Sequence, residues 1–422
     1  MMDGGPVEGL RVLLEPVLGA VEGEDLVRLS GGSTRETGSF TAGGRDLILR
    51  RDPPDRPGPK RAMHTEVQVM SACAAAGLPV PEVLADDDGG VLGTEGMIMA
   101  RAFGEALPRR ILRDEHLAGA RAVLVEQLGQ FLAGLHAIDP ASIPGLRAVD
   151  HLEESWHTYE AANIASPTLE KAYDWLVSNR PPSAAEVVVH GDLRLGNVLV
   201  IPEGLSAVLD WELVHRGDPL EDLAWMCVKA WRFGAPLEVA GLGTIDDLVT
   251  AYEGAGGPTV DHDALHWWLV QKTVLWGFGC ISQAHAHLSG AHRSHELAAI
   301  GRRASEQEWD TIELLAPDAW AAAKQAPRRA EQRDTPGVYS RPTARELIEA
   351  VRHWLTEDVM PGTSGHLAYH ARVAANVLAV VERELAQGSP NVDIGTKASS
   401  WADLAEAVRT KLVVNSPNHL AL

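Results

Sequence analysis

The sequence reads Val189-His-Gly-Asp-Leu-Arg-Leu-Gly-Asn197 and, shortly afterwards, Val208-Leu-Asp-Trp-Glu212. Two β-type runs flank a polar loop that carries Asp192 and Asn197, and Asp210 stands at the end of the second run. Transfer of a phosphoryl group from ATP needs a carboxylate beside the attacking hydroxyl and oxygen ligands for Mg²⁺ at fixed distances. The spacing therefore predicts Asp192 as the catalytic base and Asn197 and Asp210 as Mg²⁺ ligands.

The order of these residues matches a known motif: His-x-Asp, four residues, Asn, and then an Asp-containing triplet, as in protein kinases. Each piece alone would fit an ordinary turn or a polar strand end, and only the combination favours a catalytic loop. We expect His190 to be structural, hydrogen-bonding beneath the metal-binding turn. Asp222, in the first turn of a helix predicted from Leu220 to Trp231, is expected to support the same loop.

A nucleotide site is predicted upstream of this loop. Gly31, Gly32 and Ser33 lie where a strand-turn-strand could cover ATP phosphates, although the same triplet occurs in ordinary hairpins. Arg50 ends a strand-like run at the position where a kinase's third strand carries Lys, and we expect it to pair with Glu66 on the following helix. The alternative is an edge-strand arginine with a surface glutamate. Met99, in the run Gly96 to Ala100, is assigned to the same nucleotide site.

The pattern of elements predicts an α+β, bilobal, protein-kinase-like fold. Residues 1–101 read as a β-rich N-terminal lobe, a small antiparallel sheet with one helix at 62–76. Residues 102–325 are mostly helical in period and include a small hairpin with the catalytic loop. Residues 326–341 look like a linker, and residues 342–422 read as a three-helix domain whose helices start with Thr343/Glu346 and Ser400/Asp403 signals.

Composition narrows the function class. The 422 residues are 45% hydrophobic and 23% charged, and no apolar run approaches the roughly 20 residues that span a bilayer. The N-terminus has no secretory signal, and three widely spaced cysteines indicate reduced thiols, so a cytoplasmic location is expected. A net charge of −21 argues against nucleic-acid and membrane partners. A phosphate-bearing ligand would have to meet local arginines, with candidates at 50, 51, 101, 109, 110 and 113.

These motifs together resemble the aminoglycoside-phosphotransferase-like superfamily over roughly residues 20 to 315. Arg in place of the strand Lys, and the triplet Asp210-Trp-Glu212, most resemble the branch related to kinase-like domains fused to mammalian acyl-CoA dehydrogenases. The segment Trp267 to Gly279 is similar to the branch's substrate-side helix, with aromatics expected in the core. The last 80 or so residues resemble a small helical module fused to, or encoded beside, such kinases.

The resemblance implies an ATP- and Mg²⁺-dependent phosphotransferase with a small-molecule alcohol as acceptor. In bacterial hydroxy-acid degradation, kinases of this branch with a small helical partner phosphorylate 4-hydroxyacyl-CoA thioesters, so an acyl-CoA thioester is the substrate that the resemblance favours. An aminoglycoside or other small-alcohol kinase, or an inactive kinase-like binding protein, are the alternatives. The sequence leaves the oligomeric state open.

Overall fold

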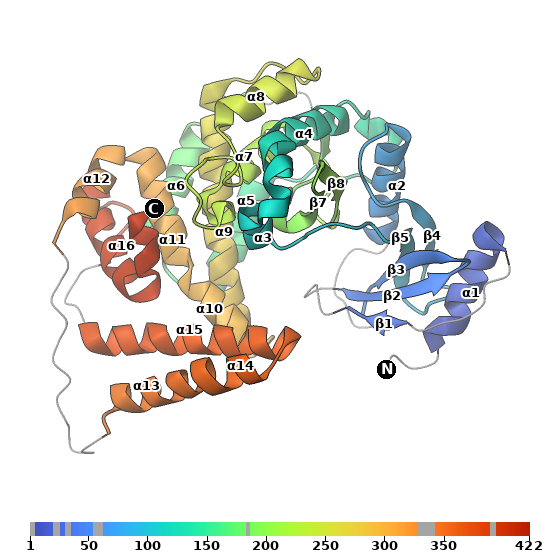
Figure 1. Ribbon diagram of the computed structural model, residues 1–422. Coiled ribbons are helices and arrows are strands. Elements are labelled where there is room, and N and C mark those ends of the chain that lie inside the picture. The colour runs from blue at the N-terminus through green and yellow to red at the C-terminus, as the bar shows by residue number, and fades with distance from the viewer. Residues whose placement is uncertain are drawn as a thin grey trace. The chain divides into compact units, whose positions relative to one another are not determined.

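The computed structural model describes residues 5–19, 26–29, 35–53, 62–182, 186–327, 342–388 and 394–422. The chain forms two compact units: unit 1 comprises Met1–Val149 and Pro182–Leu265, and unit 2 comprises Asp150–Pro181 and His266–Leu422. The fold is α+β and kinase-like, with a β-rich N-terminal part and a mostly helical remainder, as the sequence predicts (Figure 1).

Unit 1 begins with a five-stranded antiparallel sheet in the order β1-β2-β3-β5-β4. Its strands are β1 (Val27–Arg28), β2 (Glu36–Ala42), β3 (Arg45–Arg51), β4 (Val83–Asp88) and β5 (Glu95–Ala100). Helix α1 (Gly5–Leu18) packs Leu10 and Leu14 against Leu47 and Leu49 of β3. Because side chains alternate along a strand, Arg50 lies on the sheet face opposite to Leu49. Helix α2 (Ala62–Ala75) connects β3 to β4.

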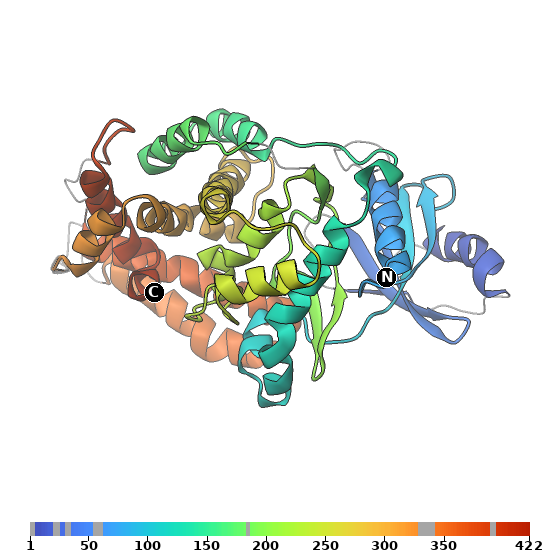
Figure 2. The ribbon, with the colours of Figure 1, turned by 90° about the horizontal axis from the view of Figure 1, so that it is seen from above.

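The remainder of unit 1 is helical with two short hairpin-like pairs. Helix α4 (Ala118–His136) lies beside α8 (Ile245–Gly254), which Figures 1 and 2 both show. The other elements are α3 (Pro108–Arg113), β6 (Val187–Val189) paired with β9 (His215–Gly217), β7 (Val198–Ile201) paired with β8 (Gly204–Val208), and α7 (Leu220–Cys227).

Several of the predicted elements are confirmed, and others need correction. The helix expected at 62–76 is α2, and the segment Trp267 to Gly279, which resembles a substrate-side helix, lies within α9 (His262–Leu288). The two β-type runs around the catalytic loop are β6 and β8, but each pairs with a strand that was not predicted, β9 and β7 respectively, so they do not form a hairpin with each other. The helix predicted from Leu220 to Trp231 ends at Cys227, and a separate 3₁₀ turn, Lys229–Arg232, follows.

Unit 2 is helical throughout its described residues. Trp267 on α9 lies in an aromatic core that also contains Tyr159 and Phe278. This places the aromatics of the Trp267 segment largely in the core, as expected. The helices are α5 (His151–Ala162), α6 (Pro167–Ser178), most of α9, α10 (His295–Arg302), α11 (Ala304–Leu315), α12 (Pro317–Gln325), α13 (Ala344–Trp354), α14 (Met360–Gly362), α15 (Gly365–Gln387) and α16 (Trp401–Asn415).

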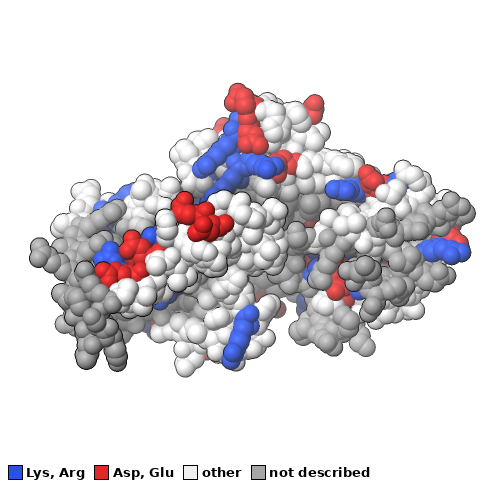
Figure 3. Space-filling view, turned by 60° about the horizontal axis from the view of Figure 1, so that its bottom comes forward, with Lys and Arg blue, Asp and Glu red and all other residues white. Residues whose placement is uncertain are grey.

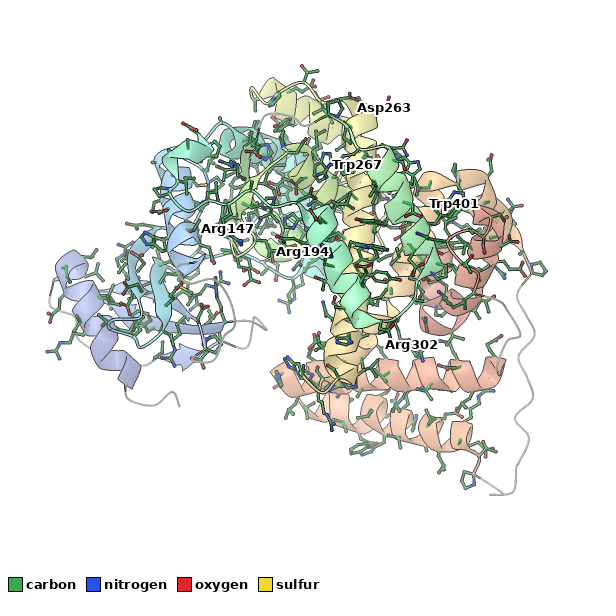
Figure 4. The ribbon with its side chains drawn as sticks, turned by 180° about the vertical axis from the view of Figure 1, so that it is seen from behind. Arg147, Arg194, Asp263, Trp267, Arg302 and Trp401 are labelled. Atoms are coloured by element: carbon green, nitrogen blue, oxygen red, sulfur yellow. The ribbon has the colours of Figure 1, made fainter. Side chains whose placement is uncertain are left out.

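The C-terminal helices do not share one separate core. Thr343 and Glu346 form the predicted capping box of α13, which lies beside α15. Helix α16 instead packs Leu404 and Val408 against Trp309 of α11. Side chains add to these links: Arg302, labelled in Figure 4, bonds Glu384 of α15 and Asn415 of α16. The predicted domain boundaries, with a linker at 326–341 that lies mostly outside the described residues, stay a prediction.

No helix within the described ranges has the length and apolar composition needed to cross a membrane. On the face drawn in Figure 3, basic and acidic side chains lie in small neighbouring groups.

Candidate active site

The predicted catalytic loop begins where β6 ends, and hydrogen bonds of His190 hold it in place. The imidazole is completely buried. Its Nδ1 accepts a hydrogen bond from the backbone N–H of Asp192 (3.1 Å), so Nε2 carries the proton and donates to the carbonyl oxygen of Leu209 (3.0 Å). His190 therefore joins the start of the loop to the residue before Asp210, and its role is structural, as the sequence predicts.

Asp222 fixes the same loop from α7. Its carboxylate accepts the backbone N–H groups of His190 (2.8 Å) and Gly191 (2.9 Å) and lies 3.3 Å from Nε2 of His136. Burial alone would raise the pKa of Asp222, but the bonds from His136 and the loop hold that pKa below its ordinary value. Gly191 has a φ of 81°, and a Cβ there would lie 2.6 Å from the carbonyl oxygen of Leu213. The turn thus requires glycine.

Three donors hold the carboxylate of Asp192 in one orientation. Oδ1 accepts from the indole N–H of Trp225 (2.7 Å) and from Nε of Arg194 (3.0 Å). Oδ2 accepts from Nδ2 of Asn197 (2.7 Å), which also bonds the carbonyl oxygen of Asp192 (2.8 Å). With two donors on Oδ1 and one on Oδ2, Oδ2 is the oxygen with room for a further donor such as an acceptor hydroxyl.

An aromatic and cationic group surrounds this carboxylate, and the sequence did not reveal it. The guanidinium of Arg194, labelled in Figure 4, lies over the ring of Trp231, 4.9 Å from its centroid. The rings of Trp225 and Trp231 are 5.2 Å apart. Both tryptophans are buried, so their indoles form rigid walls beside Asp192. Aromatic residues in an apolar helix read as core, so no local signal could have singled them out.

Asp210 lies next to Asn197 because the backbone N–H of Leu209 donates to the carbonyl oxygen of Asn197 (2.8 Å). Its φ is 65°, a left-handed conformation that is uncommon outside glycine and that concentrates at functional sites. Oδ1 of Asp210 pairs with Nη2 of Arg50 at 2.9 Å. The structure thus brings three of the predicted residues, Asn197, Asp210 and Arg50, to one place.

These oxygen donors fit a magnesium ion. Mg²⁺ prefers carboxylate and carbonyl oxygens and keeps several of its waters, so one or two protein ligands are enough. Because Asn197 uses its amide nitrogen to hold Asp192, its amide oxygen is left to act as a ligand. Asp210 has Oδ2 available beside the oxygen that Arg50 holds. The assignment of Asn197 and Asp210 as Mg²⁺ ligands stays a prediction.

The prediction that Arg50 forms an ion pair with Glu66 is wrong. Glu66 is buried, and both of its oxygens face Arg35, with Nη1 to Oε2 and Nη2 to Oε1 each at 2.6 Å. Arg50 pairs with Asp210 instead. The physical reason is competition for one carboxylate: Arg35 approaches Glu66 in a bidentate geometry, the strongest arrangement available to a guanidinium and a carboxylate.

Of the other residues predicted to bind the nucleotide, the structure describes Met99 but not the remaining three. Met99 is a buried residue of β5, opposite Ile48 of β3 and Val83 of β4. Gly31, Gly32 and Ser33 lie outside the described residues. Their assignment to the nucleotide site stays a prediction, as does that of Met99.

The three cysteines take no part in this site. Cys73, Cys227 and Cys280 are buried free thiols, as the sequence predicts. Burial raises the pKa of each thiol to about 12, which suppresses the reactive thiolate.

Comparison with protein families gives two matches. Residues 25–266 match the family described as "Phosphotransferase enzyme family", more than half of the chain. Residues 361–393 match a domain of unknown function, DUF6285.

The curated proteins that this chain resembles are longer than the chain. The chain is 31% identical over 241 residues to acyl-CoA dehydrogenase family member 10 of Mus musculus, covering 53% of this chain and 22% of that protein. It is 26% identical over 374 residues to acyl-CoA dehydrogenase family member 11 of the same species, covering 81% and 46%. The chain thus spans less than half the length of these relatives.

Solved structures share the fold. A crystal structure of a protein named as an aminoglycoside phosphotransferase, from Ralstonia eutropha, has a TM-score of 0.58 at 22% identity, covering 76% of this chain and 99% of that one. The macrolide 2′-phosphotransferase of Brachybacterium faecium has a TM-score of 0.50 at 20% identity, with 74% and 99% covered. An aminoglycoside phosphotransferase solved with ADP and hygromycin B also scores 0.50 at 21% identity, with 73% and 99% covered.

Proposed function

Because this chain belongs to the phosphotransferase enzyme family, we propose that it transfers the γ-phosphoryl group of ATP to a hydroxyl group of a small molecule. The observation that carries the proposal is the carboxylate of Asp192, held by three donors beside Asn197 and Asp210. A catalytic base must be fixed in orientation while one of its oxygens stays accessible. Oδ2 of Asp192 meets that requirement.

Each residue then has a role. Asp192 accepts the proton of the acceptor hydroxyl as that oxygen attacks the γ-phosphorus, and the bond from this phosphorus to the β–γ bridging oxygen breaks to release ADP. Asn197 and Asp210 would hold Mg²⁺, which would neutralise the negative charge of the nucleotide phosphates when bound. Arg50, 2.9 Å from Asp210, is close enough to the metal ligands to contact a nucleotide phosphate as well. We assign Gly31, Gly32, Ser33 and Met99 to nucleotide binding as part of the same proposal.

For the acceptor we favour a hydroxyacyl-CoA, of the 4-hydroxyacyl-CoA type, in hydroxy acid catabolism. The similarity to acyl-CoA dehydrogenase family members 10 and 11 supports this choice, because it connects the chain with proteins named for acyl-CoA chemistry. The structural neighbours support the alternative, an aminoglycoside or other small-alcohol kinase, to the same extent. Buried, unreactive thiols support a reducing compartment, the cytoplasm.

The test is ATP consumption by the purified protein with a panel of acceptors, with the mass of each product measured. The panel holds 4-hydroxyacyl-CoAs, the matching free hydroxy acids, 3-hydroxyacyl-CoAs and aminoglycosides. We expect the highest kcat/KM with a 4-hydroxyacyl-CoA and a product heavier by one phosphoryl group. A preference for aminoglycosides would overturn the acceptor, and no phosphorylated product with any compound would favour the binding-protein alternative.

The matched control for this assay is Asp192→Asn. Removing the base should lower kcat by roughly 10²- to 10⁴-fold. An amide at this position also places an N–H₂ group against either Asn197 or the Trp225 and Arg194 donors, so a modest loss of nucleotide affinity is expected too. Turnover close to that of the wild type would remove Asp192 from the mechanism.

A further inference from the structure

Arg35 occupies a position in this fold that no motif assigned to it. The side chain is 6% exposed, and each of its three nitrogen groups has a carboxylate partner. Nη1 donates to Oε2 of Glu66, Nη2 lies at ion-pair distance from Oε1 (2.6 Å), and Nε donates to Oδ1 of Asp52 at 2.9 Å. Although burial alone would lower it, the pKa of Arg35 is raised above its ordinary value because these carboxylates stabilise the cation. Arg35 is therefore a buried cation in unit 1 with a carboxylate beside each of its three nitrogens.

Arg35 and its two carboxylate partners come from three different segments of the chain. Arg35 is the residue immediately before β2, and Asp52 is the residue immediately after β3. The β2–β3 ladder pairs Glu36 with Arg51, so Arg35 and Asp52 stand together at the open end of this hairpin. Glu66 projects from α2. One guanidinium thus ties the start of β2, the end of β3 and helix α2 together.

This placement determines which arginine forms an ion pair with Glu66. Both oxygens of Glu66 face Arg35, while Arg50 is paired with Asp210, whose carboxylate belongs to the proposed metal site. A competing cation does not readily displace a guanidinium from a buried, bidentate pair with a carboxylate. Breaking that pair would leave a charge unpaired in the interior. Arg50 is therefore available on the side of Asp210.

We propose that Arg35 is the positioning residue of the nucleotide site: it, and not Arg50, is the fixed partner of Glu66, and it joins the start of β2 to the end of β3 and to α2. Arg50 is thereby left to act on the nucleotide side, next to Asp210. Arg35 does not touch the nucleotide itself, since its side chain is buried and each of its nitrogens faces a carboxylate of the protein. The part that concerns the nucleotide rests on the proposed function, whereas the pairing of Arg35 with Glu66 does not.

A double-mutant cycle on thermal unfolding, measured without nucleotide, tests the pairing. The variants are Arg35→Met, Glu66→Leu and Arg50→Met, with both double variants that contain Glu66→Leu. We expect Arg35→Met and Glu66→Leu each to lower Tm by several degrees, and their combination to be no less stable than the worse single variant. Arg50→Met should lower Tm by a degree or two at most, and its effect should add to that of Glu66→Leu.

The nucleotide readout separates positioning from general destabilisation. At a temperature where all variants are folded, Arg35→Met should raise the KM for ATP about tenfold and leave the acceptor KM within twofold. Arg35→Lys, which keeps a cation but cannot form the bidentate pair, should recover only part of this loss. Arg50→Met should raise the KM for ATP and also lower kcat, because it acts beside Asp210.

Each outcome of these experiments either supports or contradicts the proposed role of Arg35. Coupling of Glu66 with Arg50 rather than with Arg35, or an unchanged Tm in Arg35→Met, would overturn the proposal. Failure of Arg35→Met to fold while Arg50→Met folds normally would support it, and the milder pair Arg35→Lys and Glu66→Gln then gives the cycle. A wild-type protein inactive towards every acceptor would contradict the proposed function while leaving the unfolding cycle fully interpretable.

Discussion

The indole N–H of Trp225 donates to Oδ1 of Asp192 at 2.7 Å, across 33 positions of sequence. Arg194 donates to the same oxygen, and its guanidinium lies over Trp231, so the two tryptophans and the arginine form one group around the base. A carboxylate held in this way has lost its rotational freedom before an acceptor arrives. In the proposed mechanism, this group orients the carboxylate of Asp192 before the acceptor binds.

Trp225→Phe should therefore lower kcat and spare the nucleotide. Loss of a hydrogen bond to a charged group costs about 1.5–3 kcal/mol, which corresponds to a decrease in kcat of roughly ten- to a hundredfold. Steady-state kinetics with ATP and the acceptor varied separately would show this, with the KM for ATP unchanged. The control is Trp354→Phe, an exposed tryptophan on α13, whose kinetics should match the wild type. A Trp225→Phe enzyme with normal kcat would show that the bond does not orient the base.

Asp210→Ala should weaken nucleotide binding in the presence of Mg²⁺ far more than in its absence. The change removes a charged oxygen ligand and also the partner of Arg50. Calorimetric titration of ATP at several Mg²⁺ concentrations measures both effects. Asp263→Ala, an exposed carboxylate at the start of α9, is the control. An unaltered Mg²⁺ dependence in Asp210→Ala would move the metal site to other residues.

The buried carboxylate of Asp222 makes stability depend on pH in a defined direction. Its pKa is lowered in the folded protein from an ordinary value of 3.8, so the unfolded chain binds this proton more tightly. The stabilisation is complete above about pH 4 and is lost as the pH falls through the lowered value. Asp222→Asn should cost about 2–3 kcal/mol at pH 7.

Urea unfolding between pH 3 and pH 8 checks this dependence. The difference between Asp222→Asn and wild type should be largest at neutral pH and should shrink below pH 4. The exposed Asp318→Asn on α12 serves as control and should follow the wild-type curve. A difference that grows on acidification would contradict the lowered pKa.

Leu404→Ala should destabilise unit 2, although residue 404 lies beyond the proposed linker. Leu404 is 1% exposed and packs in one cluster with Trp309 and Ile312 of α11. Large-to-small changes in such a core cost about 2–5 kcal/mol, which would lower Tm by roughly 5 °C or more. Leu367→Ala on α15, where the side chain is 66% exposed, is the matched control. Equal Tm values for the two variants would mean that α16 does not stabilise this core.

The local geometry of the loop that carries Asp192 and Asn197 was predictable because its residues lie close together in sequence. From His190 to Asp210 the spacing is set by one loop and one hairpin, so chemistry and local geometry give the same answer. The pairing of Arg35 with Glu66 joins residues 31 positions apart, and two arginines were available for one carboxylate. Only the sheet register, which places Arg35 beside Asp52, decides between them.

Element predictions followed the same rule. The long helices α2 and α9 have clear apolar composition and distinct ends, whereas β2 (Glu36–Ala42) and β4 (Val83–Asp88) are rich in small and acidic residues and give little strand signal. Their strand state depends on pairing with β3 and β5. Helix α1 contains Pro16 and was missed for a similar reason, because contact with the sheet stabilises it.

The cluster shared by α11 and α16 bears on how such genes can recombine. Trp309 and Ile312 are encoded before the proposed linker, and Leu404, Val408 and Leu412 after it, yet they form one core. A crossover between the two coding regions would divide that core, and each half would inherit an uncovered apolar surface. Exchange of the last helices between relatives is therefore constrained to partners whose α11 fits them, so the two regions should evolve by matched substitutions rather than by free reassortment.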